Sequence, residues 1–454
     1  MLRSSIKRLK KRVSSGLLVR KFANRRSLNM STPHEDEIRL NNDIVKEAIS
    51  VKEGLPCSDT VENVSYEVRM GSEKGDNFTC TIFALSAKGT IKGSEEKTYE
   101  FIAKVIPVEP SRVDFVKYSR LNATEVFFYK KIAPTLREYA TKYSELKVFF
   151  PEVYHIDEEA GVFIFENFKT QGYKMRDRKV GLDEAHINIA FTRLAAHHTL
   201  TYHYIQENGT NALEEAGILR KGWLLETPIA NEIMGYMNTL IQTISGVVAT
   251  KDEALSNDLN TFFGAKNPAD CINELLAKQS PMQLVLHGDG WVNNFLFKYN
   301  EKGDPIDMVA VDFQISRVGD PCQDVSHLMF PCTSPKERKE KWEAWLCHYY
   351  KSLKTHMKIM GYELESLYPE ESMKKSFEDY RVFGFMLATF MSMHMLTDEA
   401  KEGGSMDMDN FKGQELSDVM QSTDKTIESI LKCDNSLKQR LVDLAREAKE
   451  NGIF

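Results

Sequence analysis

The chain has 454 residues, of which 42% are hydrophobic and 28% are charged, so it has an ordinary globular composition and enough length for two separately packed lobes. Its first 30 residues contain ten Lys or Arg and no acid, which leaves the remainder with 49 basic and 66 acidic residues, a net charge of −17. An acidic body of this kind argues against nucleic-acid binding.

Composition disfavours further classes of protein. The sequence has no run of 18 apolar residues, so it does not predict an integral membrane protein. Its seven cysteines are widely spaced and include no Cys-x-x-Cys pair. This pattern is typical of a reducing compartment and argues against a disulfide framework or a zinc site. Nothing in the sequence implies a protein partner, and the oligomeric state is left open.

Residues 1–37 form a basic leader that we expect to be disordered or to serve in targeting. Apolar residues recur there at helical spacing among Lys and Arg: Leu2, Ile6, Leu9, Val13 and Leu17. One interpretation is a mitochondrial transit peptide, because such peptides are rich in Ser and poor in acids. The other is an upstream start codon, with Met30 beginning the functional protein. The second interpretation is slightly favoured and predicts a cytoplasmic protein, with mitochondrial localisation as the alternative.

Two segments with alternating apolar residues, 61–70 and 78–86, predict a β-hairpin at the head of the globular part. The loop between them contains Gly75 and Asn77, and its backbone N–H groups could hold phosphates. Because the loop lacks a full GxGxxG pattern, a simple β-turn is the alternative.

The next predicted strand carries Lys104 on the same face as Ile102 and Ile106, so the ammonium group needs a buried partner. A helix predicted to open at Asn122 carries Glu125 on its inner face. Glu125 could be only the capping-box partner of Asn122. The alternative is the Lys–Glu ion pair that positions the α- and β-phosphates in kinases.

A buried strand, 162–166, then ends in a polar break at Glu166. The following segment, 183–206, is predicted to be helical and contains His197 and His198. We expect these two histidines to pack or to cap the helix, because no metal-ligand spacing accompanies them.

The segment 284–324 contains the strongest functional signal. An apolar strand leads into a His-Gly-Asp triplet that ends at Asp289, and Asn294 follows five residues later. A second apolar strand leads into Asp312. Two strands joined by a turn would bring these three side chains together. Phosphoryl transfer needs such a set, because one Asp orients and deprotonates an acceptor hydroxyl while an Asn and a second Asp hold Mg²⁺.

The words HGDGWVNNFLF and VAVDFQISRVGDPCQD resemble the ecdysteroid-kinase-like group, also called CHK kinase-like proteins. That group is related to choline kinases, aminoglycoside phosphotransferases and, more distantly, protein kinases. The Trp after HGDG and the Gln after VDF point to this group, because the aminoglycoside enzymes usually carry a second His in the loop. The resemblance covers roughly Asp43 to the C-terminal helices, which is nearly the whole chain past the first thirty residues.

The resemblance implies an α+β fold of the two-lobe protein-kinase-like type. A β-rich N-lobe would span residues 38–168 and a mostly helical C-lobe residues 169–454, with ATP and Mg²⁺ between them. Glu166 to Phe168 would form the hinge that meets the adenine edge, and Asp324 would support the catalytic loop from behind.

The resemblance also implies a role for each candidate residue. Asp289 would be the catalytic base, and Asn294 and Asp312 would hold the metal. The nucleotide would be bound by the following residues: Gly75, Asn77, Lys104, Glu125, Glu166 and Phe168.

The predicted activity is that of a phosphotransferase with an alcohol group as acceptor, and the partner is a small molecule. An ecdysteroid or xenobiotic hydroxyl is the favoured acceptor. The alternatives are a choline- or ethanolamine-type kinase and a catalytically inactive pseudokinase that binds a nucleotide or ligand. A protein kinase is disfavoured, because only eleven residues separate Asp312 from Asp324 and no Ala-Pro-Glu follows.

Overall fold

The computed structural model describes residues 39–72, 79–214, 217, 219, 227–395 and 435–454. Every described residue belongs to one compact unit, residues 36–454. The predicted leader, residues 1–37, therefore lies outside the described residues. So do Gly75 and Asn77 of the predicted phosphate-binding loop.

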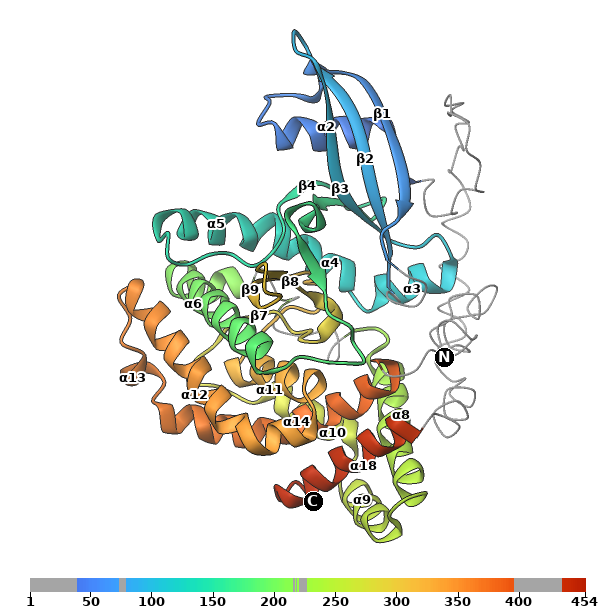
Figure 1. Ribbon diagram of the computed structural model, residues 1–454, viewed down its shortest axis with the longest axis vertical. Coiled ribbons are helices and arrows are strands. Elements are labelled where there is room, and N and C mark those ends of the chain that lie inside the picture. Colours follow the sequence, from blue (N-terminus) through green and yellow to red (C-terminus); the bar gives the residue numbers. More distant parts are fainter. Residues whose placement is uncertain (1–38, 73–78, 215–216, 218, 220–226, 396–434) are drawn as a thin grey trace. The chain divides into compact units, whose positions relative to one another are not determined.

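A five-stranded antiparallel sheet forms the core of the N-terminal part of this unit (Figure 1). Its order is β1-β2-β3-β5-β4, with the bounds Val61–Met70 (β1), Thr81–Ile91 (β2), Glu96–Val105 (β3), Val153–Asp157 (β4) and Val162–Glu166 (β5). Buried side chains alternate along β2, so that Phe83 and Leu85 share an apolar cluster with Ile44 and Ile49 of α2 (Asn42–Lys52).

The two faces of β3 have different environments. Phe101, Ala103 and Val105 belong to the cluster shared with α2. Lys104 and Ile102 alternate with them, so they point to the opposite face of the sheet, where both line a cavity. Their shared face is the one that the sequence pattern predicts.

Between β3 and β4 the chain is helical: α3 (Pro110–Tyr118), α4 (Leu121–Phe127), a π-helical segment η3 (Phe128–Ile132) and α5 (Ala133–Lys142). Helix α4 begins at Leu121, after Arg120 in a left-handed conformation with φ 61°. Among the described residues no side chain caps this end. The capping box between Asn122 and Glu125 that the sequence allowed is therefore not formed.

The described residues after the five-stranded sheet are mostly helical (Figure 1). The helices there are α6 (Glu184–Glu214), α8 (Ala230–Ala249), α9 (Glu253–Ala265), α10 (Pro268–Ala277), α11 (Pro321–Cys332), α12 (Pro335–Ile359), α13 (Leu364–Leu367), α14 (Glu370–Met395) and α18 (Asn435–Glu450). Helix α6 is kinked at Gly209, whose φ is 68°, close to the predicted end of that helix at residue 206.

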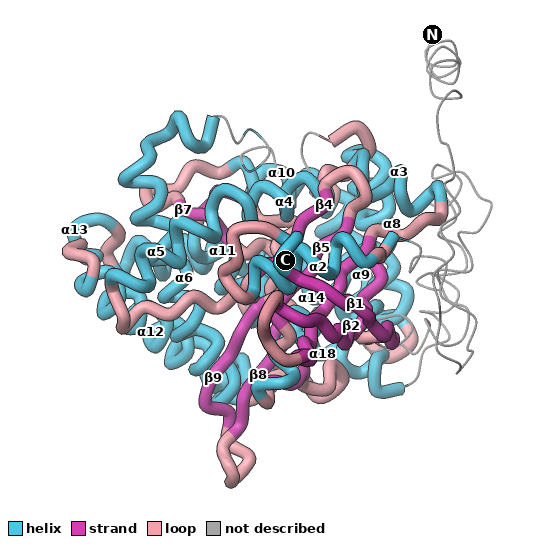
Figure 2. The backbone as a smooth tube through the Cα atoms, turned by 90° about the horizontal axis from the view of Figure 1, so that it is seen from above, coloured by secondary structure: helices cyan, strands magenta, loops and turns pink. Residues whose placement is uncertain are grey.

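Two small antiparallel sheets lie among these helices. One pairs β7 (Leu284–Leu286) with β10 (Arg317–Gly319), and the other has the order β6 (Tyr173–Met175), β8 (Phe295–Tyr299), β9 (Pro305–Ala310). Figure 2 shows β8 and β9 side by side, joined by a loop at one end. This is the hairpin predicted to bring the catalytic residues together.

The arrangement is the predicted α+β, two-lobe protein-kinase-like fold, with a β-rich N-terminal lobe and a mostly helical C-terminal lobe. A large apolar core runs through the helical part and includes α4 and α5, whereas the sheet and α2 share a smaller one. None of the helices that the structure describes is both long and apolar enough to span a bilayer.

Candidate active site

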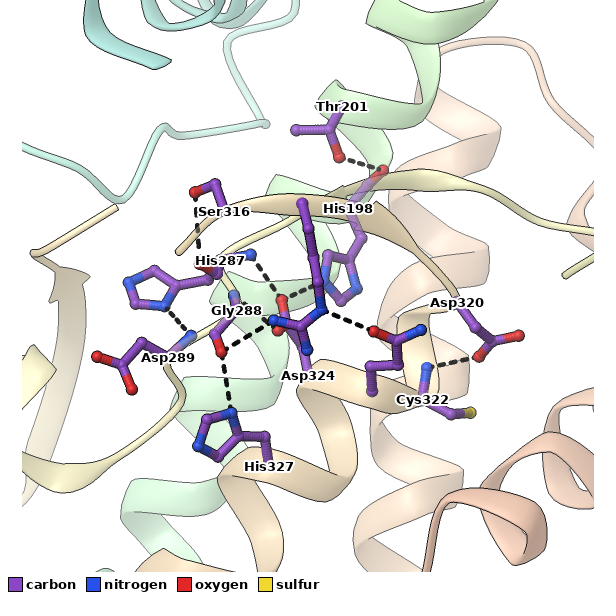
Figure 3. Close-up of polar contacts among 12 residues, drawn as sticks. His198, Thr201, His287, Gly288, Asp289, Ser316, Asp320, Cys322, Asp324 and His327 are labelled. Atoms are coloured by element: carbon purple, nitrogen blue, oxygen red, sulfur yellow. Dashed lines mark hydrogen bonds and ion pairs between the residues drawn. The ribbon is translucent and has the colours of Figure 1, made fainter. Parts of the chain in front are cut away.

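The loop after β7 carries Asp289 and is held through its backbone. The N–H groups of His287 and Gly288 donate to Oδ2 and Oδ1 of Asp324, at 2.8 and 2.9 Å. Nε2 of His198 donates to the same carboxylate at 3.2 Å (Figure 3). Burial would raise the pKa of Asp324, but the hydrogen bond and charge of His198 hold it well below its ordinary value. Asp324 thus supports the loop from behind, as predicted.

Asp289 itself is fixed by two neighbours. Its N–H donates to Nδ1 of His287 at 3.1 Å, and Nε2 of that ring donates to the carbonyl of Val311 at 3.0 Å. Burial lowers the pKa of His287, so the ring is neutral and its two contacts define the tautomer. Nδ2 of Asn294 donates to both the carbonyl and Oδ2 of Asp289, at 3.1 and 2.8 Å. This leaves Oδ1 of Asn294 as an oxygen able to bind a cation.

Asp312 follows β9 and has a φ of 71°, a left-handed conformation that Asp adopts more readily than most residues. Its Oδ1 accepts from Nζ of Lys104 at 2.7 Å. The same Nζ donates to Oε2 of Glu125 at 2.5 Å. Lys104 and Glu125 are buried, at 8% and 2% exposure. The structure therefore brings the predicted Lys–Glu pair together and extends it to Asp312.

The site carries more negative than positive charge. Burial raises the pKa of Asp289 to about 7, and the charge of Asp312 adds to the rise. Burial also raises the pKa of Glu125 to about 7, although Lys104 opposes the shift. Burial would lower the pKa of Lys104, but Asp312 and Glu125 raise it well above its ordinary value, so the lysine stays charged.

This excess of carboxylate charge, with the oxygen of Asn294, fits a divalent cation. Within the described ranges no three His, Cys, Asp or Glu side chains converge into a ready-made metal cage. Mg²⁺ does not require one, because a protein usually contributes one or two carboxylates while phosphates and water complete the coordination.

A cavity of about 130 Å³ opens beside Lys104. Its lining includes many of the residues predicted from the sequence: Lys104, Glu125, Glu166, Phe168, Asn294 and Asp312. Asp289 is not part of this lining and is connected to it through the hydrogen bonds from Asn294. The cavity thus joins the predicted nucleotide-binding residues to the predicted metal-binding pair.

An aromatic stack that the sequence did not predict connects the two halves of the site. Phe313 stacks on Phe128 of the π-helical segment, with ring centroids 4.1 Å apart and an interplanar angle of 12°. The ring of Phe313 also lies 4.5 Å from that of His287. Phe313 therefore links the helical segment after Glu125 to the loop of Asp289. A Phe after Asp312 was visible in the sequence, but its partners depend on tertiary packing.

Two further contacts of the catalytic loop were also missed. Nη1 of Arg317 donates to the carbonyl of Gly288 at 3.2 Å. Nδ1 of His327 donates to the same carbonyl at 3.0 Å (Figure 3). Arg317 begins a three-residue strand and is flanked by Ser316 and Val318, so its sequence surroundings gave no signal. His327 lies in the middle of α11 and carried no sequence signal. Of the predicted packing histidines, His198 bonds to Asp324.

The sequence model of the ecdysteroid kinase-like family matches residues 74–362, more than half of the chain. The chain therefore belongs to the ecdysteroid kinase-like family, as its motifs suggested. A comparison with curated proteins finds no match.

Three solved structures resemble the fold. Choline kinase LicA from Streptococcus pneumoniae has 15% identity and a TM-score of 0.34, covering 85% of this chain and 98% of its own. The GDP complex of aminoglycoside 2'-phosphotransferase-IIIa has 13% identity and a TM-score of 0.31, covering 76% and 97%. A microcompartment-associated aminopropanol kinase has 14% identity and a TM-score of 0.30, covering 78% and 98%. TM-scores this low add nothing to the family assignment.

Proposed function

We propose that the protein is a kinase that uses ATP and Mg²⁺ to phosphorylate an alcohol group on a small molecule. The observation that carries the proposal is the convergence of Asp289, Asn294 and Asp312 beside the cavity that Lys104 and Glu125 also line. An ecdysteroid or xenobiotic hydroxyl is the favoured acceptor. Membership of a family named for ecdysteroid kinases supports that choice.

Asp289 is proposed as the catalytic base. Asn294 occupies its Oδ2, so Oδ1 remains to orient the acceptor hydroxyl and take up its proton. A pKa of about 7 suits this role, because a general base works best when its pKa lies near the working pH. The contacts of His287 and Asn294 hold the carboxylate in place before any substrate arrives.

Lys104, Asn294 and Asp312 are proposed to hold the phosphates and the metal. Bound Mg-ATP would supply the transferable γ-phosphoryl group and a divalent charge. Lys104, oriented by Glu125, would bind phosphate oxygens, while the carboxylate of Asp312 and Oδ1 of Asn294 would coordinate Mg²⁺.

The remaining assignments complete the nucleotide side. We propose that Glu166 and Phe168, which line the same cavity, meet the base, and that Gly75 and Asn77 cover the phosphates. The N-lobe would span residues 38–168 and the C-lobe residues 169–454. The protein would act in the cytoplasm, with a mitochondrial location as the alternative.

A choline- or ethanolamine-type kinase and a catalytically inactive pseudokinase would have the same site geometry. One experiment distinguishes them from the proposed function. Purified protein is mixed with Mg-ATP and, separately, with ecdysone, xenobiotic alcohols, choline and ethanolamine, and phosphorylated products are identified by mass spectrometry. We expect phosphorylation of ecdysone or of a xenobiotic alcohol. Phosphorylation of choline or ethanolamine alone would establish the cationic-acceptor alternative. Calorimetric binding of Mg-ATP with no product from any acceptor would favour the pseudokinase.

A further inference from the structure

The peptide unit that joins Gly288 to Asp289 is held at both of its ends. A peptide unit is planar, so fixing its C=O and its N–H fixes the orientation of the whole plane. The N–H end belongs to Asp289 and donates to His287 at 3.1 Å. The C=O end belongs to Gly288 and accepts from Arg317 at 3.2 Å and from His327 at 3.0 Å. The plane in turn sets the direction in which Asp289 leaves the backbone.

Arg317 is locked where it makes this contact. Strand β10 pairs with β7, with Arg317 opposite Leu286, so the arginine starts beside the strand that leads into the catalytic loop. Its Nε donates to Oε1 of Gln323 at 2.9 Å, and its guanidinium carbon lies 5.9 Å from the ring centroid of Phe383. The side chain therefore has little freedom to leave the carbonyl of Gly288.

Gly288 is shaped to receive the guanidinium. It has a φ of 88°, and a Cβ at this position would lie 2.9 Å from Nη1 of Arg317 and 2.3 Å from the carbonyl oxygen of Ile315. Any side chain here would push the arginine and the loop apart. The triplet His-Gly-Asp thus needs its glycine for the contact with Arg317 as well as for the left-handed turn.

Burying the guanidinium of Arg317 at this position costs free energy. Arg317 is only 7% exposed, and its Nη2 is buried with no hydrogen-bond partner among the described residues, which is unfavourable for a charged group. A neutral side chain would fill the same space without that cost. The nearby carboxylates of Asp324 and Asp289 attract the guanidinium. The positive charge of Arg317 therefore stabilises it beside the negatively charged loop that it holds.

We propose that Arg317 is a positioning residue for the reaction: its guanidinium fixes the Gly288–Asp289 peptide plane and so aims the Asp289 carboxylate at the acceptor. This inference rests on the proposed role of Asp289 as the base. Arg317 does not line the cavity and so acts through Asp289. His327 holds the same carbonyl and is the weaker of the two donors, because its ring is neutral and charge-assisted hydrogen bonds are stronger.

The test is hydrogen–deuterium exchange of the Asp289 amide in the full chain without substrates, measured by mass spectrometry on peptides spanning residues 284–296. In Arg317→Met we expect exchange to accelerate by roughly tenfold, the effect of losing a charge-assisted hydrogen bond. Arg317→Lys keeps the charge and one donor, so it should stay close to the wild type. His327→Phe should fall between them.

Arg338→Met is the matched control. Arg338 is also a buried arginine, at 1% exposure, and it donates to the carbonyls of Phe330 and Thr333 but not to the catalytic loop. Its loss should lower thermal stability without selectively speeding exchange at Asp289. If Arg317→Met does not fold, Arg317→Gln, which also removes the charge, takes its place. A larger acceleration in His327→Phe than in the charge-removing variant of Arg317 would overturn the proposal.

Kinetics supply the second readout. With ecdysone as acceptor, Arg317→Met should lower kcat by roughly 10²-fold, the effect of misplacing a catalytic group by about 1 Å, with the KM for ATP nearly unchanged. Unchanged exchange at Asp289, or an acceleration spread evenly over the chain as in Arg338→Met, would overturn the positioning role. The exchange result does not depend on turnover, so it stands even if no acceptor is phosphorylated and the proposed function fails.

Discussion

The two halves of the candidate site are held by different kinds of interaction. Asp289 sits in a loop fixed by hydrogen bonds from within the C-terminal lobe, to Asp324, His287 and Asn294. Lys104, Glu125 and Asp312 come from β3, α4 and the end of β9, and short ion pairs between them hold this half together. The catalytic half is thus preorganised inside one lobe, whereas the nucleotide half requires both lobes.

This difference predicts how each half of the site responds to salt and to mutation. Backbone hydrogen bonds to a buried carboxylate depend little on salt, because water and ions do not reach them. The ion-paired half contains one ammonium between two carboxylates. Removing Lys104 would leave two buried carboxylates without a counter-charge, and removing either carboxylate would take away one of the two groups that hold the ammonium. Mutations in the first half should therefore change turnover, and mutations in the second should change nucleotide affinity.

The largest effect is expected for Asp289→Asn. Because the amide cannot accept the hydroxyl proton, turnover should fall by roughly 10² to 10⁴-fold, with little change in the affinity for Mg-ATP. Steady-state kinetics with the accepted alcohol, together with calorimetry, measure the two quantities. Near wild-type turnover would mean that another group is the base.

Asp312→Asn should act on the other half. Asn tolerates the φ of 71° at this position better than Ala would, so the change removes charge without adding backbone strain. We expect the Mg²⁺-dependent part of nucleotide affinity to weaken by roughly 10²-fold, since one member of a buried charge pair is lost. Calorimetry with ADP, with and without Mg²⁺, tests this, and equal Mg²⁺ dependence in both proteins would place the metal elsewhere.

Glu125→Gln should have a smaller effect on the same half. Lys104 would keep Asp312 as a partner but lose the group that orients it, so the KM for ATP should rise about tenfold, the equivalent of 1.4 kcal/mol. The exposed pair Lys341–Glu184 provides the control, because Glu184→Gln should leave the KM unchanged. A tenfold drop in kcat at constant KM would instead assign Glu125 to the catalytic half.

The stability of the nucleotide-free protein should depend on the charge of Asp289. Its pKa rises from 3.8 to about 7 on folding, so between these values the folded state binds more protons than the unfolded state and stability falls as pH rises. Above pH 7 the destabilisation is complete, at most about 4 kcal/mol. Asp289→Asn should therefore raise Tm by roughly 2–4 °C at pH 8 and change it little at pH 4. An equal shift at both pH values would show that the charge is not the cause.

The smallest effect is expected for removal of residues 1–29, so that the chain begins at Met30. If the leader is a transit peptide or an upstream extension, Tm and turnover should match those of the full chain. Differential scanning fluorimetry measures Tm, and steady-state kinetics with the accepted alcohol measure turnover. An insoluble or inactive truncated protein would mean that the leader packs on the globular unit.

The candidate residues whose proximity sequence reasoning predicted are those whose positions follow from local order. Asp289 and Asn294 are separated by a short loop, and Asp312 follows the paired strand, so hairpin geometry alone brings them together. Lys104 was identified because a charge on an apolar strand face requires a partner. Glu125 was proposed as that partner because it lies on the inner face of the helix predicted to open at Asn122.

The missed residues depend on packing between distant segments. Arg317 and His327 reach the carbonyl of Gly288 from β10 and α11, and nothing in the spacing of the sequence links them to it. The ring of Phe128 meets Phe313 across 185 positions of the chain. Such contacts depend on how helices and sheets dock, which hydrophobic periodicity does not encode.

Because the segment Phe128–Ile132 is π-helical, the number of residues between Glu125 and α5 determines how the two helices are rotated relative to each other. A π-turn is a local insertion of one residue into an α-helix, and each residue of an α-helix turns the chain by about 100°. Deleting one residue within 128–132 would restore regular α-helix and rotate α5 relative to α4 by about that angle. Leu136, now fully buried, would turn towards solvent, or Glu125 would turn away from Lys104. The π-helical segment therefore sets the rotation of α5 relative to α4. With it in place, Glu125 of α4 lines the cavity while Leu136 of α5 is buried in the core.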